Sequence, residues 1–442
     1  MLVKINRVIL MTVLLMTFCF CIYAVSASGS SEAKKDTLVV LSHQVHANCA
    51  TGTSLENDTT KEFMDRNSLN QIEWRTYGTA ELAEKLFREA SLTNTPVDIG
   101  YLLNASSSPV ITSLFEPLDG YMKKKPIEEF GDFPKGMLDA FTFDNELYAI
   151  PVRVAVSLMH ANVAIFEERG VPYPPKNIEE IFDAAKKLTY TKPNGEKVYG
   201  MVIFGLPSVV GDPVLSFARA WPNVDFVSSD YQVMINEKPI AQIIDRFKDL
   251  IDSGVMPQET TSMDINDMIS YFQSGKAAMC WGASGYNAVF NDPKISKVAG
   301  KVKSFAVPAS IDSPKSVSIA DGVCNIWAMV IPRGAQNKEL SWDFIRHLST
   351  KKSVLQMALN GNGPARLSTY DEPDFTKSDP ELAAAIKQVL NTGRPAWPGF
   401  ENTSQAQEAL GREIHLALLG RKSAQQAMDD AKKEIEELVP KK

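Results

Sequence analysis

Short apolar runs alternate along the first third of the chain with stretches of helical spacing. Residues 38–41 form a run typical of a buried strand, and residues 72–77 alternate apolar with polar positions. Residues 81–92 repeat apolar side chains at the spacing of one helical face, and a third apolar run covers 97–103. Strands separated by helices predict parallel pairing, so this region is expected to form an open α/β sheet.

The segments after these strands are the expected ligand side of the sheet. In open α/β sheets, ligands bind in the crevice outside the carboxyl ends of the strands. We therefore expect the segments 43–53, 77–79 and 104–108 to approach a ligand, and the composition of 42–53 predicts a polar loop.

An apolar segment with one proline lies near the middle of the chain, at 144–166. Pro151 fixes its own φ and forces Ile150 away from helical angles, so the segment is predicted to cross in extended form rather than as a helix.

Helix signals are sharper in the second part of the chain. Asn177 precedes a helical face that ends at Leu188, and it is placed to cap that helix. Further helices are predicted at 240–251 and 265–272, and an apolar strand at 277–281 follows the second of them. Near the C-terminus, Ser423 is placed to cap an Ala-rich helix.

Length and composition describe an ordinary globular chain of 442 residues, long enough for two or three domains. Apolar residues make up 44% and charged residues 22%, which excludes a disordered or fibrous protein. The net charge of -7 gives no support for nucleic-acid binding.

The first 27 residues have the composition of a signal peptide. Lys4 and Arg7 precede an uncharged run at 8–25, and small residues end at Ala27, where cleavage is expected. The alternative is an uncleaved membrane anchor, because the run approaches the length that crosses a bilayer. Both alternatives export the body of the protein, and we expect a periplasmic location.

Three cysteines follow this segment: Cys49, Cys280 and Cys324. One disulfide is possible in an oxidising compartment, and the sequence does not choose the pair. Cys280 and Cys324 lie beside apolar strands, so they are expected to be buried as small hydrophobic residues.

Catalytic motifs are missing from the sequence. It contains no His-Glu-x-x-His, no Gly-x-Ser-x-Gly and no phosphate-binding Gly-x-x-x-x-Gly-Lys-Ser/Thr. His43, His46 and Cys49 lie within seven residues of one another, but a structural zinc site needs a fourth ligand, so polar lining of a ligand site is favoured. We predict no catalytic residue, no metal and no cofactor.

Several motifs follow one another along the chain: Glu-Leu-Tyr-Ala-Ile-Pro at 146–151, Phe-Gln-Ser-Gly-Lys-Ala-Ala-Met at 272–279, the segments 321–332 with 338–348, the Gly-Pro turn in 360–370, and 412–431. Taken together in this order, they resemble the bacterial extracellular solute-binding proteins of family 1, the sugar-capturing receptors of ABC importers. Two positions depart from the family pattern, since Ala161 replaces a usual Tyr, and Gly285 or Tyr286 stands where Trp is common.

The resemblance implies an α/β, two-lobed periplasmic binding protein fold in which each lobe is an open α/β sheet. Three hinge crossovers near 153–156, 323–328 and 363–367 would join the lobes. The first lobe would comprise 36–153 plus 326–363, and the second 155–324 plus 366–442. The implied function is capture of a small carbohydrate or related solute between closing lobes, by a monomer that delivers it to an inner-membrane ABC permease.

Site residues follow from combining these crossovers and strand ends with the chemistry of sugar binding, in which aromatic faces pack on the ligand and polar groups bond its hydroxyls. The predicted ligand-binding residues are His43, Asn104, Arg153, Trp281, Ser284, Tyr286, Asp321, Arg366 and Trp397. Trp327 is a further aromatic candidate. An anionic ligand such as a polyol phosphate would rely on Arg153 and Arg366, and a secreted enzyme is the remaining alternative.

Overall fold

The computed structural model describes residues 37–52 and 54–441, so the predicted signal peptide lies outside the described residues. Its main sheet has the strand order β2-β1-β3-β11-β6-β9-β8-β7, and β10 pairs with β6. The strands are β1 (Thr37–Ser42), β2 (Gln71–Thr76), β3 (Ile99–Leu103), β6 (Ile150–Asn162), β7 (Tyr190–Thr191), β8 (Lys197–Val202), β9 (Ala277–Ala283), β10 (Val302–Phe305) and β11 (Cys324–Val330). Strands β4 (Thr142–Phe143) and β5 (Glu146–Leu147) form a separate hairpin.

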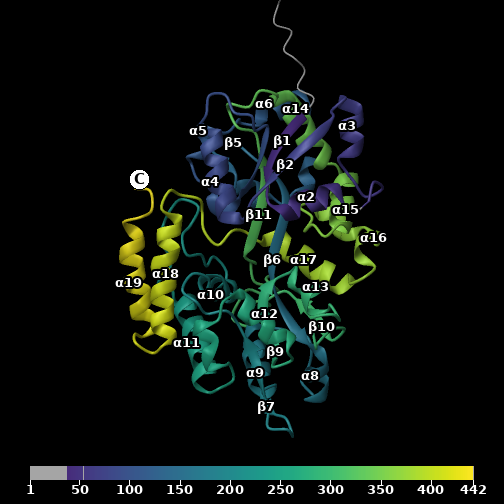
Figure 1. The fold of residues 1–442 in the computed structure, drawn as a ribbon. Helices are drawn as coiled ribbons and strands as arrows, with labels where there is room; N and C mark the ends of the chain where they lie inside the picture. The colour runs from purple at the N-terminus through teal and green to yellow at the C-terminus, as the bar shows by residue number, and fades with distance from the viewer. Residues whose placement is uncertain (1–36, 53, 442) are drawn as a thin grey trace, which may run out of the picture.

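Strand β6 runs through both halves of the molecule, as Figure 1 shows. Its first half pairs with β11 up to Val156, and its second half pairs with β9 from Ser157 onward. Pro151 begins this 13-residue strand together with Ile150, so the predicted extended crossover is confirmed. In the first half, β1 pairs in parallel with β2 and β3, which confirms the predicted open α/β sheet.

Two hydrophobic cores lie on either side of this crossing. The first contains β1, β3, the start of β6 and β11, and the second contains the end of β6, β8 and β9. Helices packing on the first core are α2 (Gln44–Thr51), α3 (Lys61–Asn67), α4 (Thr79–Ala90), α5 (Ile111–Leu114), α6 (Asp119–Lys124), α7 (Lys135–Asp139), α14 (Lys338–Leu348), α15 (Lys351–Leu359), α16 (Pro373–Thr376) and α17 (Pro380–Thr392). Those on the second core are α8 (Val163–Glu168), α9 (Ile178–Lys187), α10 (Gly211–Ala218), α11 (Lys238–Asp252), α12 (Ile265–Gln273), α13 (Tyr286–Phe290), α18 (Thr403–Leu418) and α19 (Ala424–Glu436). We call the two halves lobe 1 and lobe 2.

Residues 366–392 pack differently from the predicted division of the chain. Tyr370, Ala383 and Val389 belong to the core of lobe 1, although 366–442 was expected in lobe 2. Helix α17 also contacts β6 and β10, so it lies where the two halves meet (Figure 1). The exact lobe boundaries therefore stay a prediction.

The expected polar loop at 42–53 is wrong for most of its length, because α2 occupies 44–51. Small and apolar residues, Ala47, Cys49 and Ala50, give this segment a buried face. His43 caps the helix, since Val45 N donates to His43 Nδ1 over 3.3 Å. The caps predicted further along are confirmed, with Glu180 N donating to Asn177 Oδ1 and Gln426 N donating to Ser423 Oγ.

Cys49, Cys280 and Cys324 are all buried free thiols. The prediction that Cys280 and Cys324 are buried small hydrophobic residues is confirmed. Over the described part of the chain, no helix combines the length and the apolar composition that a membrane crossing requires.

Candidate functional site

The two strands that join the lobes present one partly solvent-accessible face. Arg153 pairs with Trp327 and Ala155 pairs with Asn325, so these four residues lie together on that face. Asn325 is exposed and the other three are partly buried, whereas the intervening Val154 and Ile326 are fully buried. Side chains alternate across a strand, so this pattern places the four residues on one face, which we call the hinge face.

Lobe 1 contributes two histidines next to the hinge face. The His46 ring packs against Tyr101 at a centroid distance of 4.7 Å and against Trp327 at 4.8 Å, while His43 lies 6.4 Å from Trp327. Burial, followed by the nearby charges of Arg153 and His43, lowers the pKa of His46 to about 3. His46 is therefore neutral at pH 7, and its Nε2 has no hydrogen-bond partner among the described residues.

Arg153 is the cationic group of the hinge face. Burial lowers the pKa of Arg153, with Cys49 acting in the opposite direction, and an arginine remains charged at pH 7. Within the described chain we find no ion pair or hydrogen bond of its guanidinium. A partly buried, unpaired guanidinium is costly for stability, so its placement favours a role in binding.

Asn104 begins the turn η1 (Asn104–Ser106) directly after β3 and is 9% exposed. Its Oδ1 accepts a hydrogen bond of 2.7 Å from Ile326 N, which fixes the amide against β11. This bond uses the oxygen of the amide and leaves its two N–H groups as donors.

A small cavity of about 60 Å³ lies between the lobes beside Asn104. We call it the interlobe cavity, and its lining comes from both lobes and from the hinge face: Asn104, Ala105, Asp212, Asn325, Ala396, Trp397, Pro398, Gly399, Thr403 and Gln407. Ligand pockets usually measure roughly 300–1,000 Å³, so the lobes must move apart to admit a sugar-sized molecule.

Asp212 is the charged residue of this lining. It lies in the first turn of α10, and burial raises the pKa of Asp212 to about 6 while the charge of Arg219 opposes the rise. Among the described residues, its carboxylate forms neither a hydrogen bond nor an ion pair.

Trp397 lies in the lining and is 9% exposed. Its ring also packs on Phe226 at 5.3 Å and on Phe400 at 6.5 Å, so one part of the residue belongs to the core of lobe 2.

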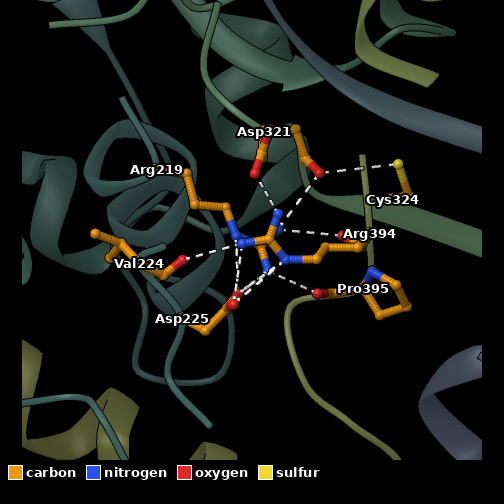
Figure 2. Close-up of polar contacts among 8 residues, drawn as sticks. Arg219, Val224, Asp225, Asp321, Cys324, Arg394 and Pro395 are labelled. Carbon is orange, nitrogen blue, oxygen red and sulfur yellow. Dashed lines mark hydrogen bonds and ion pairs between the residues drawn. The ribbon is translucent and has the colours of Figure 1, made fainter. Parts of the chain in front are cut away.

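A network of two arginines and two aspartates holds the segment that leads to Trp397 (Figure 2). Arg219 is 2% exposed and donates to the carbonyls of Arg394 over 3.1 Å and of Pro395 over 2.8 Å. Asp225 accepts from Arg219 over 2.6 Å and from Arg394 over 2.9 Å, and Arg394 also pairs with Asp321. The network thus ties the Trp397 segment to α10 and to the start of the β11 crossover.

The predicted residues of lobe 2 lie in its core or beside the hinge. Trp281 is 2% exposed and packs on Phe204 at 5.4 Å, inside the core. Tyr286 is partly buried beside Gly282, and the charge of Asp212 contributes, after burial, to raising the pKa of Tyr286. Ser284 lies next to the hinge, where its backbone N–H donates to Val156 O over 2.7 Å.

Two predicted residues have structural partners instead. Arg366 is 1% exposed, and its guanidinium donates to the carbonyls of Ser349, Glu128 and Glu129 and to Asp132. Asp321 is paired with Arg394 as described above. We leave Arg366, Trp281 and Asp321 out of the proposed site, because their side chains are buried in the core or already paired.

The structure brings His43 and Arg153 together at one end of the hinge face, and Asn104 and Trp397 together at the interlobe cavity. Asp212 and Asn325 were missed from the sequence. Asn325 could have been found from the alternation along β11, where Asn325 and Trp327 are the accessible positions. Asp212 follows β8 by a loop, and no pattern in the sequence singles it out.

The fold and the cavity between its lobes define a two-lobed solute-binding protein. Residues 58–384 match the family described as bacterial extracellular solute-binding protein. The chain belongs to this family, which confirms the class inferred from the motifs.

The relatives found by sequence similarity are distant. A binding protein of Brucella abortus (strain 2308) is 24% identical over 304 residues, covering 68% of this chain and 70% of that protein. The sn-glycerol-3-phosphate-binding periplasmic protein UgpB of the same strain is 23% identical, covering 66% and 67%.

Solved structures share the fold over nearly the whole chain. Maltose-bound MalE3 of T. maritima has a TM-score of 0.72 at 19% identity, covering 91% of this chain and 99% of that one. An ABC transporter solute-binding protein from Agrobacterium radiobacter K84 in complex with ribitol has a TM-score of 0.72 at 21% identity, covering 91% and 98%. At these identities the likeness establishes the fold alone.

Proposed function

We propose that the protein is the periplasmic receptor of an ABC importer, and that it captures a sugar or polyol between its lobes and releases it to an inner-membrane permease. It would act as an exported monomer and bind its solute without converting it. The observation that carries the proposal is the interlobe cavity, which combines the amides of Asn104 and Asn325, the carboxylate of Asp212 and the ring of Trp397.

This combination suits a polyhydroxylated ligand. Amide and carboxylate groups can donate to and accept from hydroxyls, while an aromatic face packs on the apolar C–H surface of a sugar. The relatives named above include proteins whose ligands are maltose, ribitol and sn-glycerol 3-phosphate, and all three ligands carry several hydroxyls.

The first experiment is a thermal-shift screen of the mature protein with maltose, ribitol, D-mannitol, D-tagatose and sn-glycerol 3-phosphate. A ligand that binds only the folded state raises the melting temperature in proportion to the logarithm of its concentration over Kd. Small-angle scattering with a positive compound should then give a smaller radius of gyration than without it. A positive compound that is turned over would overturn the assignment as a receptor.

Arg153 supports a second candidate function, the binding of a solute that carries a phosphate or carboxylate. Its unpaired guanidinium could form charge-assisted hydrogen bonds with such a group. Affinity for sn-glycerol 3-phosphate would then fall as ionic strength rises, whereas affinity for a neutral polyol would not. The variant Arg153→Gln should lose the anionic ligand and keep most of its affinity for neutral ones.

A further inference from the structure

The interlobe cavity contains one formal charge, and it is negative. Of the residues in its lining, Asp212 alone is ionisable, because the others are amides, hydroxyl-bearing or apolar residues. The charged group acting on Asp212 is Arg219 at the end of its own helix, and Asp212 in turn contributes to raising the pKa of Tyr286 in α13. Arg219 is already committed to Asp225 and to backbone carbonyls, so it does not neutralise the cavity as a direct partner.

The other polar side chains of the cavity lining include hydrogen-bond donors. Asn104 offers the N–H groups of an amide whose oxygen is bound to Ile326 N, and Asn325 and Gln407 offer complete amides. The cation of the site, Arg153, lies elsewhere on the hinge face, two residues along β6 from the position that pairs with Asn325. Arg153 is absent from the lining of the cavity, so the cationic group and Asp212 belong to different parts of the site.

We propose that Asp212 determines the specificity of the interlobe cavity, accepting hydrogen bonds from ligand hydroxyls and excluding a phosphate or carboxylate from this end. The inference rests on the proposed function and adds to it the orientation and chemical class of the ligand. A neutral polyol end enters the cavity, and any anionic end must lie towards Arg153.

An unpaired carboxylate in a narrow cavity destabilises the folded protein when no ligand is bound. Burial without a partner disfavours the charged form, which agrees with the direction of the Asp212 pKa. Side chains that bind a ligand commonly lower the stability of the free protein in this way. Replacing such a side chain often leaves the stability unchanged or raises it. A carboxylate with a structural role would behave in the opposite way.

The test compares the wild type with Asp212→Asn, with Asp249→Asn as a control of equal net charge, because Asp249 is exposed on α11. Probes are ribitol and D-mannitol, which are neutral, sn-glycerol 3-phosphate, which has one anionic end, and D-glucarate, which has two. At pH 7.5 we expect Asp212→Asn to weaken binding of the neutral probe about 10- to 100-fold. The ratio of the Kd for D-glucarate to the Kd for a neutral probe should also be smaller in Asp212→Asn than in the wild type.

The melting temperature without ligand and the pH dependence of affinity distinguish a binding role of Asp212 from a structural one. Without ligand, Asp212→Asn should melt at or above the wild-type temperature at pH 7.5. Wild-type affinity for the neutral probe should fall as the pH is lowered from 7.5 to 5, because Asp212 becomes protonated, and the variant should lose this dependence. A lower apo melting temperature, or unchanged affinity of Asp212→Asn for a bound neutral probe, would overturn the inference while the proposed function stood. If the wild type bound none of the four probes, the proposed function itself would fail for this ligand class.

Discussion

Gly399 should be a position at which one added methyl group disfavours lobe closure. The Cβ of an alanine at 399 would lie 1.5 Å from Ser107 O, 2.5 Å from the Ser107 carbonyl carbon and 3.1 Å from Ser108 N. Ordinary contact begins at 3.4 Å, so the first of these atoms would have to retreat by 3.4 minus 1.5, or 1.9 Å. All three are backbone atoms, and no side-chain rotation can relieve the clash.

The clash lies between the lobes rather than within one core. Ser107 follows η1 in lobe 1, where its Oγ donates to Ala140 O, whereas Phe400, next to Gly399, belongs to the core of lobe 2. Inserting a methyl group into packed structure costs about 1–3 kcal/mol. Each 1.4 kcal/mol changes an equilibrium constant tenfold, so this cost shifts the equilibrium from the closed towards the open form by about 5- to 140-fold. Since ligand binds the closed form, Kd should rise by the same factor.

Calorimetric titration of Gly399→Ala with the strongest sugar or polyol from the screen measures this change. Scattering on the same samples should show less compaction than the wild type at equal ligand concentration. Gly131→Ala is the matched control, because no atom lies within 4 Å of its added Cβ. Wild-type affinity and full compaction in Gly399→Ala would refute the reasoning, and a large loss of apo stability would indicate a core role instead.

Three further predictions concern stability and the site. Arg219→Met should lower the free energy of unfolding by about 3–5 kcal/mol in denaturant titrations, because it removes one partner of a buried ion pair, while Lys61→Met at an exposed pair should lower it far less. Burial lowers the pKa of His160 to about 4, below the ordinary 6.5, so the unfolded chain binds this proton first. Stability should therefore fall by about 1.4 kcal/mol per pH unit as the pH drops from 6.5 towards 4, and His160→Gln should remove that part of the slope. Trp397→Ala should lose ligand affinity and also about 3 kcal/mol of stability, because its ring packs on Phe226; wild-type affinity in titration would remove it from the site.

Periodicity predicted the helices and strands well, because in a long amphipathic segment the spacing of apolar residues itself indicates the secondary structure. The helix predicted at 265–272 is α12, Ile265–Gln273, and Pro151 correctly indicated the extended crossing. The prediction for 42–53 failed because Gln44 and Asn48 lie on the exposed side of α2, while its small residues Ala47 and Ala50 pack inward. A short helix of small residues gives little periodic signal.

The site was predicted less completely, because lining a cavity depends on packing between distant segments. Arg366 and Asp321 follow crossovers as ligand residues would, yet tertiary contacts pair them with Asp132 and Arg394. Asp212 approaches Asn104 only after α10, η1 and the Trp397 segment have been brought together. No local pattern in the sequence encodes that contact, so the sequence identified Asn104 and Trp397 and missed Asp212 and Asn325.

The position of β11 determines the order in which this chain can fold. Gly100 in β3 pairs with Val330, and Val156 in β6 pairs with Cys324, so β11 completes the sheet of lobe 1 by inserting between two strands made much earlier. Until synthesis passes residue 330, β3 and β6 each lack a neighbour, and most of lobe 2 is produced in the interval. Such distant pairings slow folding, and open strand edges attract other chains. The N-terminal lobe is therefore unable to mature first, and a chain truncated before 324 should aggregate rather than yield an isolated lobe 1.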